Sequence, residues 1–133
     1  MIQESNSPTE LPFELQSMAK AKRYQRWLAD LVLPHLGQRI LEIGAGIGNM
    51  SQHLPIREHL ILSEMDENLL GLLRTKFASA EPEKVAVCGN LPLSAPFFSD
   101  ANIDTFISFN VLEHVVADVD LVKQALTLLK ESG

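Results

Sequence analysis

Residues 40–51 read ILEIGAGIGNMS, a short apolar run followed by glycines at alternate positions, Gly44, Gly46 and Gly48. The run suits a β-strand, and we expect the glycines to form a turn that leads into a helix. Glycine has no Cβ, so the backbone can turn sharply after Ile43 and a ligand can approach the main chain closely. A plain strand-to-helix turn is the alternative, and a nucleotide-binding loop is the functional interpretation.

A carboxylate supports the functional interpretation. Glu64 lies sixteen residues after Gly48, at the end of a second apolar segment. At the end of a neighbouring parallel strand, this side chain would face the same crevice as the glycine loop and could accept hydrogen bonds from both hydroxyls of a ribose. The alternative is a solvated carboxylate at a strand end. Asp66, two residues later, is interpreted as the N-cap of the next helix.

Strand and helix patterns alternate along the chain. The apolar segments are 39–44, 59–64, 84–89 and 103–109. Their apolar residues are nearly continuous, as in strands that helices cover on both faces. Helical spacing of apolar residues occupies 16–32, 66–77 and 118–130. This order predicts an α/β fold built on a doubly wound parallel sheet.

Composition limits the class of protein. The chain has 133 residues, 46% hydrophobic and 21% charged, which fits one domain with a buried core. Polar residues and prolines near the start predict a flexible lead-in over 1–15, before a domain of residues 16–133. The net charge of −6 argues against nucleic acid or anionic lipid as a partner. We expect a cytoplasmic protein, because the sequence has neither a membrane-spanning run nor a signal-peptide pattern.

Cysteine and histidine usage gives no metal site. Cys88 is the only cysteine, so no disulfide can form within the chain. The four histidines show no spacing typical of metal ligands, and we expect no bound metal.

The motifs resemble those of the class I S-adenosylmethionine-dependent methyltransferases. The first motif of that family is hydrophobic-acid-hydrophobic-Gly-x-Gly-x-Gly, which residues 41–48 match. The resemblance implies S-adenosylmethionine as the cofactor, with a Rossmann-like fold around it. It implies that Glu42 orients the loop and reaches the cofactor's amino group through water, and that Glu64 binds the ribose. The other cofactor contacts that it implies near these strands are Gly44, Ala45, Gly46, Gly48 and Met65.

Two later segments extend the resemblance. VCGN at 87–90 is similar to the third-strand motif, with Asn90 in place of the usual acid at the adenine amino group and Leu91 beside the ring. NIDTFISFNVLEHV at 102–115 resembles the fourth-strand motif and the Leu-Glu-His run of many small-molecule methyltransferases. Asn110 would lie at the methionine end of the cofactor, or else be a turn residue. His114 is a candidate catalytic base, with a structural role at a helix start as the alternative.

The first helix carries two aromatic residues with a possible role at the cofactor. Tyr24 and Trp27 share one helical face. Some relatives lay aromatic side chains over the cofactor as a lid, and by this resemblance Tyr24 is a candidate cofactor contact. Core packing is the alternative for Tyr24 and the expected role of Trp27.

The resemblance implies transfer of a methyl group to a small-molecule acceptor. The family fold orders its strands 3-2-1-4-5-7-6, and the sequence contains only the first four, so we expect a C-terminally incomplete sheet. Strand four would then be an open edge at which a homodimer could form. One alternative is a non-catalytic cofactor-binding module. Another is a nicotinamide-dependent dehydrogenase, whose fingerprint needs a third glycine at position 49, where this chain has Asn49.

Overall fold

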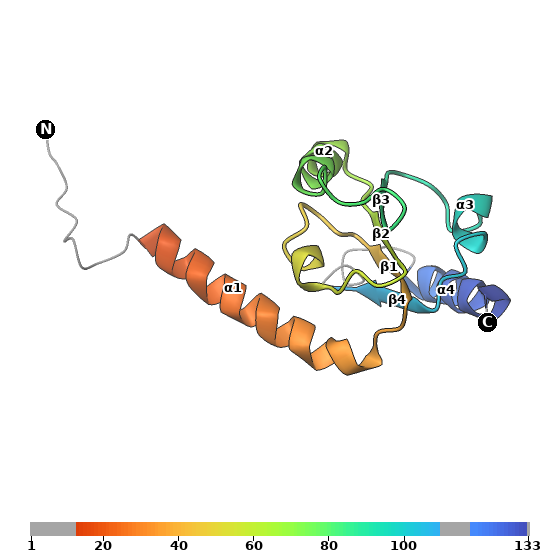
Figure 1. The fold of residues 1–133 in the computed structure, drawn as a ribbon, viewed down its shortest axis with the longest axis horizontal. Coiled ribbons are helices and arrows are strands. Elements are labelled where there is room, and N and C mark those ends of the chain that lie inside the picture. The colour runs from red at the N-terminus through yellow and green to blue at the C-terminus, as the bar shows by residue number, and fades with distance from the viewer. Residues whose placement is uncertain (1–12, 110–117, 133) are drawn as a thin grey trace, which may run out of the picture.

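The protein is described by a computed structural model over residues 13–109 and 118–132. Its first half contains α1 (Phe13–Val32), the short 3-10 helix η1 (Leu33–His35), β1 (Arg39–Ile43), the 3-10 helix η2 (Ser51–His53) and β2 (His59–Ser63). Its second half contains α2 (Glu67–Lys76), β3 (Val85–Cys88), α3 (Pro96–Ser99), β4 (Thr105–Ser108) and α4 (Asp118–Ser132). All four predicted strands are present. Figure 1 shows them side by side at the centre of the domain.

The strands form one parallel sheet in the order β3-β2-β1-β4. Ile43, the last residue of β1, pairs with Ser63 in β2 and with Ser108 in β4. Ser63 in turn pairs with Cys88, the last residue of β3. The four carboxyl ends are therefore level, and the segments that follow them emerge at one edge of the sheet. The order and direction confirm the predicted doubly wound architecture.

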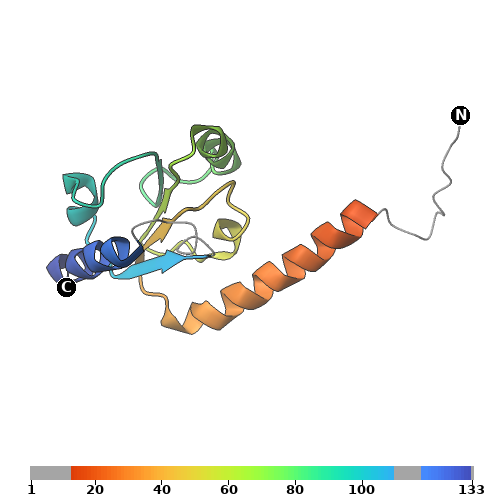
Figure 2. The same ribbon diagram turned by 180° about the vertical axis from the view of Figure 1, so that it is seen from behind.

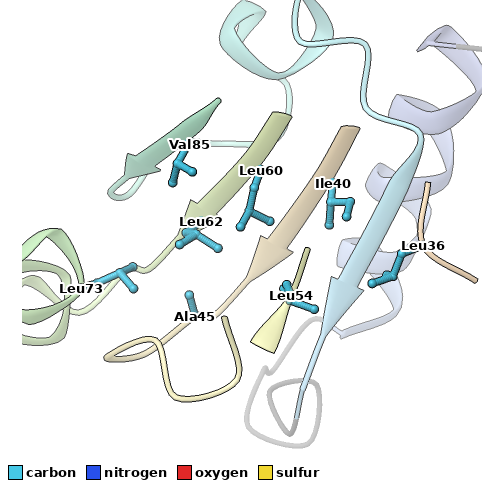
Figure 3. Close-up of a cluster of buried hydrophobic side chains, with 8 residues drawn as sticks. All are labelled: Leu36, Ile40, Ala45, Leu54, Leu60, Leu62, Leu73 and Val85. Atoms are coloured by element: carbon cyan, nitrogen blue, oxygen red, sulfur yellow. The ribbon is translucent and has the colours of Figure 1, made fainter. Parts of the chain in front are cut away.

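Two buried clusters cover the two faces of the sheet. Figure 3 shows the first, in which Ile40, Leu60 and Leu62 from the strands pack with Leu73 of α2 and with Leu54 after η2. The second cluster joins the intervening strand residues to α3 and α4, and includes Leu41, Ile61, Phe98, Ile103 and Leu128. Successive strand residues point to opposite faces. Covering both faces explains why the strand segments are apolar at nearly every position.

Two local predictions need correction. A helix was expected after the glycine loop, but this stretch contains only the three-residue turn η2, Ser51–His53. Pro55 follows closely and cannot donate a backbone hydrogen bond, so the turn has no room to lengthen. The short helix α3, Pro96–Ser99, was not predicted, and its proline occupies the first turn, where a missing N–H costs nothing.

Helix α1 differs from the expectation of a core helix. It begins at Phe13, three residues before the predicted start, and it extends away from the sheet in both views of the ribbon (Figures 1 and 2). Among its residues from Lys20 onward, Ala29 is buried and Val32 packs against the first cluster. Tyr24 is 54% exposed and Trp27 is 56% exposed. The expected core role of Trp27 is therefore wrong, and so is the alternative core role of Tyr24, because both side chains are more than half exposed.

None of the helices within the described ranges combines the length and the apolar character that a bilayer crossing requires.

Candidate cofactor site

The glycine loop follows β1, and its glycines have positive φ angles of 71°, 63° and 90° at Gly44, Gly46 and Gly48. A Cβ added to Gly46 would have no atom within 4 Å, so the loop faces open space there. A Cβ added to Gly48 would lie 3.0 Å from a ring carbon of Phe77 and 3.1 Å from a methyl of Leu73. Gly46 therefore leaves room for a ligand, whereas Gly48 lets the loop pack against α2.

Backbone hydrogen bonds fix the start of this loop. The amides of Gly44 and Ala45 both donate to the carbonyl of Ser63, at 2.9 and 3.0 Å. Gly48 donates to the carbonyl of Ala45 at 3.0 Å. The side chain of Ala45 is buried in the first cluster (Figure 3). Because these amides already have hydrogen-bond partners, we expect a ligand to contact the loop by van der Waals approach to the backbone at Gly46, where there is open space.

Glu64 lies directly against the glycine loop. Its Oε1 accepts a hydrogen bond of 2.7 Å from the amide of Gly46, and its Oε2 accepts one of 2.9 Å from the amide of Asp66. The residue is 9% exposed. A carboxylate has about four acceptor positions, so two bonds to the backbone leave capacity for two hydroxyl donors. The loop and the acid therefore lie at the same edge of the sheet, as a shared binding site requires.

Glu42 is a second carboxyl beneath this loop. It lies within β1, is 1% exposed, and accepts a hydrogen bond from the hydroxyl of Ser51, which is itself fully buried. Burial raises the pKa of Glu42 to about 7, the Ser51 hydrogen bond opposes that rise, and the nearby Glu64 charge adds to it. Ser51 ties η2 to β1 through Glu42. The contact between Ser51 and Glu42 was not predicted. The sequence contains a signal for it, because Ser51 follows the glycine loop nine residues after the acid of the strand.

The end of β3 closes the same edge on the other side of β2. The amide of Glu64 donates to the carbonyl of Cys88 at 3.1 Å, which places Gly89, Asn90 and Leu91 next to the acid. Asn90 is exposed, and Leu91 is 43% exposed. Met65, which follows Glu64, is 71% exposed. Apolar side chains that remain open to solvent at this edge suit the faces of an aromatic ring.

The remaining predicted residues are Tyr24, Asn110 and His114. Tyr24 lies on the exposed part of α1, with its ring centroid 5.9 Å from that of Trp27. Asn110 and His114 lie outside the described residues, as does the Leu-Glu-His run. Among the residues that the structure describes, no group of three or more His, Cys, Asp or Glu side chains could hold a metal ion.

The sheet order, the glycine loop and the acid after β2 define a Rossmann-like domain of the kind that binds nucleotide cofactors at the carboxyl edge of its sheet. Residues 40–133 match the family model described as "Methyltransferase domain". The chain therefore belongs to the methyltransferase domain family, and the dehydrogenase alternative is set aside.

Curated relatives are similar over part of their length. The ribosomal RNA small subunit methyltransferase A of Methylibium petroleiphilum is 29% identical over 125 residues, which cover 74% of this chain and 46% of the relative. The enzyme of the same name from Aliarcobacter butzleri is 39% identical over 61 residues, covering 46% of this chain and 21% of the relative. The chain thus spans less than half the length of these relatives.

Solved structures of methyltransferases share the fold. Magnesium protoporphyrin IX methyltransferase from Synechocystis, solved with S-adenosylhomocysteine, has a TM-score of 0.59 at 14% identity. That match covers 92% of this chain and 58% of the other. An amino pentose methyltransferase from Micromonospora echinaspora gives a TM-score of 0.53 at 17% identity, covering 92% of this chain and 53% of the other. At these identities the likeness concerns the fold alone.

Proposed function

We propose that this domain binds S-adenosylmethionine and that the whole protein transfers its methyl group to an acceptor. The observation that carries the proposal is the contact between the Glu64 carboxylate and the amide of Gly46. It joins a ribose-binding acid to a glycine loop with open space in front of it. Membership of the methyltransferase domain family supports the choice of this cofactor among adenosyl compounds.

The residues at the carboxyl edge fit the parts of the cofactor. Glu64 would accept from the ribose hydroxyls, and the backbone at Gly44 and Gly46 would lie against the adenosyl moiety. Met65 and Leu91 offer exposed apolar surface for the adenine ring, and the Asn90 amide oxygen could accept from its amino group. Glu42 is assigned to the cofactor's amino group through water.

When bound, S-adenosylmethionine supplies an activated methyl group on a sulfonium, so the hard chemistry belongs to the cofactor. The residues of this chain bind the adenosyl part, orient it on a loop fixed by backbone hydrogen bonds, and exclude water from one side. Good orientation of two reactants contributes up to roughly 7 to 11 kcal/mol to lowering a barrier. His114 remains a candidate for the proton that an acceptor must lose.

We assign a small molecule as the acceptor for two reasons. Residues 112–114 resemble the Leu-Glu-His run of small-molecule methyltransferases, and the net charge of the chain is −6. A second candidate is RNA, because the curated relatives are by name ribosomal RNA methyltransferases. A non-catalytic cofactor-binding module is the third candidate. Assays with radiolabelled cofactor separate these three, since the module would label neither a small-molecule extract nor RNA.

Calorimetry with S-adenosylhomocysteine tests the cofactor assignment. We expect Glu64→Ala to weaken binding by more than about tenfold, because the change deletes both ribose hydrogen bonds. Glu67→Ala is the matched control, since it removes an exposed carboxylate three residues away, and it should bind within about twofold of the wild type. A folded Glu64→Ala protein with unchanged affinity would contradict the assignment, as would tighter binding of a nicotinamide dinucleotide.

We also propose that the chain forms a homodimer through the exposed edge at β4. Within the described residues, β4 pairs with β1 alone, and its Ser108 hydroxyl is buried without a partner. A cavity of about 260 Å³ lies beside this edge, lined by Phe106, Ser108, Leu121, Val122, Ala125, Leu126 and Leu129. A second copy of the chain would cover it in a homodimer. Sedimentation analysis tests this, because a strictly monomeric chain would exclude pairing between copies.

A further inference from the structure

A cavity of about 550 Å³ lies between α1 and η2, and none of its lining residues is a predicted cofactor contact. Its lining residues are Lys22, Arg23, Arg26, Trp27, Asp30 and His53. The first five come from α1, and His53 ends η2, which begins three residues after Gly48. A ligand in this α1–η2 cavity would therefore be held between α1 and the short helix that follows the glycine loop. Tyr24 is the one residue of α1 that was predicted to contact the cofactor, and it does not line this cavity.

The charge of the cavity is opposite to that of the chain. The protein has 11 lysines and arginines and a net charge of −6, yet four of its cations fall within the seven residues 20–26. No acidic residue occurs from 15 to 29. In the described part of the chain, the side chains of Lys22, Arg23 and Arg26 form no ion pair or hydrogen bond. Their donors are thus available to an anion, and Asp30 offsets only one of the three charges that line the cavity.

His53 adds an unused hydrogen-bonding atom. Its Nε2 is buried and has no hydrogen-bond partner among the described residues. Burial lowers the pKa of His53, and the Arg26 and Lys76 charges lower it further while Asp30 opposes them. The ring is therefore neutral at physiological pH and can donate or accept one bond without adding charge. A buried polar atom without a partner is uncommon, and a bound group would satisfy it.

Aromatic surface lies next to these cations. Trp27 lines the cavity, and Tyr24 is next to it on the helix, with the two ring planes tilted by 32°. Both side chains are more than half exposed. Exposed aromatic rings beside arginines suit ligands that combine a planar ring with negative charge, because the ring stacks while the guanidinium groups bind the anion.

We propose that the α1–η2 cavity binds a phosphate group of the methyl acceptor, with a ring of the same acceptor stacked on Trp27. The proposal rests on the proposed function, because it concerns the acceptor of that reaction. Phosphate fits better than a carboxylate, since it offers three oxygens to the guanidinium groups of Arg23 and Arg26 and to Lys22. The same chemistry occurs in a phosphorylated small molecule and in the phosphodiester backbone of RNA.

The fluorescence of Trp27 reports this cavity, because it is the only tryptophan of the chain. The protein is first saturated with S-adenosylhomocysteine, which fills the cofactor crevice. Uridine, uridine 5′-monophosphate and a twelve-nucleotide oligouridylate are then titrated separately. We expect the two phosphate-bearing probes to quench Trp27 saturably, with uridine at least about tenfold weaker because it lacks the anion. Equal binding of uridine and its monophosphate would overturn the proposal.

Matched double variants locate the binding. Arg23→Gln with Arg26→Gln should weaken the phosphate-bearing probes by about tenfold or more. Lys84→Gln with Lys123→Gln removes the same charge from exposed positions outside α1 and should change binding by less than about twofold. Equal loss in the two double variants would show that only net charge matters and would overturn the cavity assignment.

The same titrations separate the two sources of phosphate and the two proposals. Oligouridylate that binds far more tightly than the monophosphate, with a steep dependence on salt, assigns an RNA backbone. Comparable binding of the two assigns a phosphorylated small molecule. The heat of S-adenosylhomocysteine binding reports the crevice and Trp27 reports the cavity, so a failure of either proposal is visible by itself. Both double variants should retain the wild-type affinity for S-adenosylhomocysteine.

Discussion

The carboxyl edge of the sheet and helix α1 differ in how much of their chemistry is already satisfied. At the edge, Glu64 binds two backbone amides, Glu42 binds Ser51, and Gly48 packs on α2. On α1, aromatic rings and cations remain exposed, and nearby His53 leaves an atom without a partner. The polar groups at the edge are thus held in place without a ligand, whereas the aromatic and cationic side chains of residues 20–27 in α1 are exposed and form no hydrogen bond or ion pair among the described residues. Substitutions at the two places should therefore act on different properties.

Replacement of Glu42 should have the largest effect, which is a change in how the free energy of unfolding depends on pH. Its pKa of about 7 exceeds the ordinary 4.5, so between these values the folded protein holds more protons than the unfolded chain. The free energy of unfolding therefore falls as the pH rises through this window, by about 3 kcal/mol if Glu42 acts alone. Glu42→Gln keeps an acceptor for Ser51 and removes this dependence. Urea denaturation at pH 4.5 and 8 measures it, and parallel curves for the two proteins would contradict the prediction.

Gly46 and Gly48 should respond differently to substitution by alanine, because the space around them differs. Gly48→Ala should lower the free energy of unfolding by about 2 kcal/mol, because the new methyl meets Phe77 and Leu73 at a φ of 90°. Gly46→Ala meets no atom, so it should cost about 1 kcal/mol from its backbone angle alone. That variant should instead lose affinity for S-adenosylhomocysteine, because the methyl enters the open space. Thermal denaturation and calorimetry together separate these effects, and the reverse pattern would refute the assignment.

Removing the hydroxyl of Ser51 should have an intermediate effect. Ser51→Ala leaves the buried Glu42 carboxyl without its donor and should cost about 1.5 kcal/mol in stability at pH 8. The cost should shrink at pH 5, where a protonated Glu42 carries no charge. Chemical denaturation at both pH values measures the difference. A loss independent of pH would mean that Ser51 acts through packing.

The smallest effect belongs to α1. Trp27→Ala should change the free energy of unfolding by less than about 0.5 kcal/mol, because the side chain is 56% exposed. A loss of several kcal/mol, as expected for a buried aromatic residue, would show that α1 packs more closely than the structure indicates. Circular dichroism during heating provides the measurement.

Most of the fold could be predicted because its signals are local. Apolar runs gave all four strands within two residues, and the Asp66 side chain caps α2 by accepting from the amides of Asn68 and Leu69. The proximity of Glu64 to Gly46 also followed from strand order, since parallel strands bring their carboxyl ends to one edge. The functional roles of these residues stay predictions until a ligand is bound.

The errors came from features that depend on tertiary position. Helical spacing gave Tyr24 and Trp27 a common face but could not show that this part of α1 extends past the sheet. Ser51 was missed because a hydroxyl nine residues after Glu42 is a weak signal in the sequence, and the folded loop brings the two side chains together. The helix expected after the glycines ends after one turn, because family likeness does not account for Pro55 in this chain.

Gly48 packs closely against Leu73 of α2 and against Phe77, so we expect the glycine loop and the end of α2 to move together. A molecule that stiffens the loop would also slow the opening of the last turn of α2, where the amide of Phe77 donates to the carbonyl of Leu73. Hydrogen–deuterium exchange at that amide would then report the binding of a ligand at the glycine loop. The exchange rate of the Phe77 amide would therefore detect ligand binding without a label on the ligand.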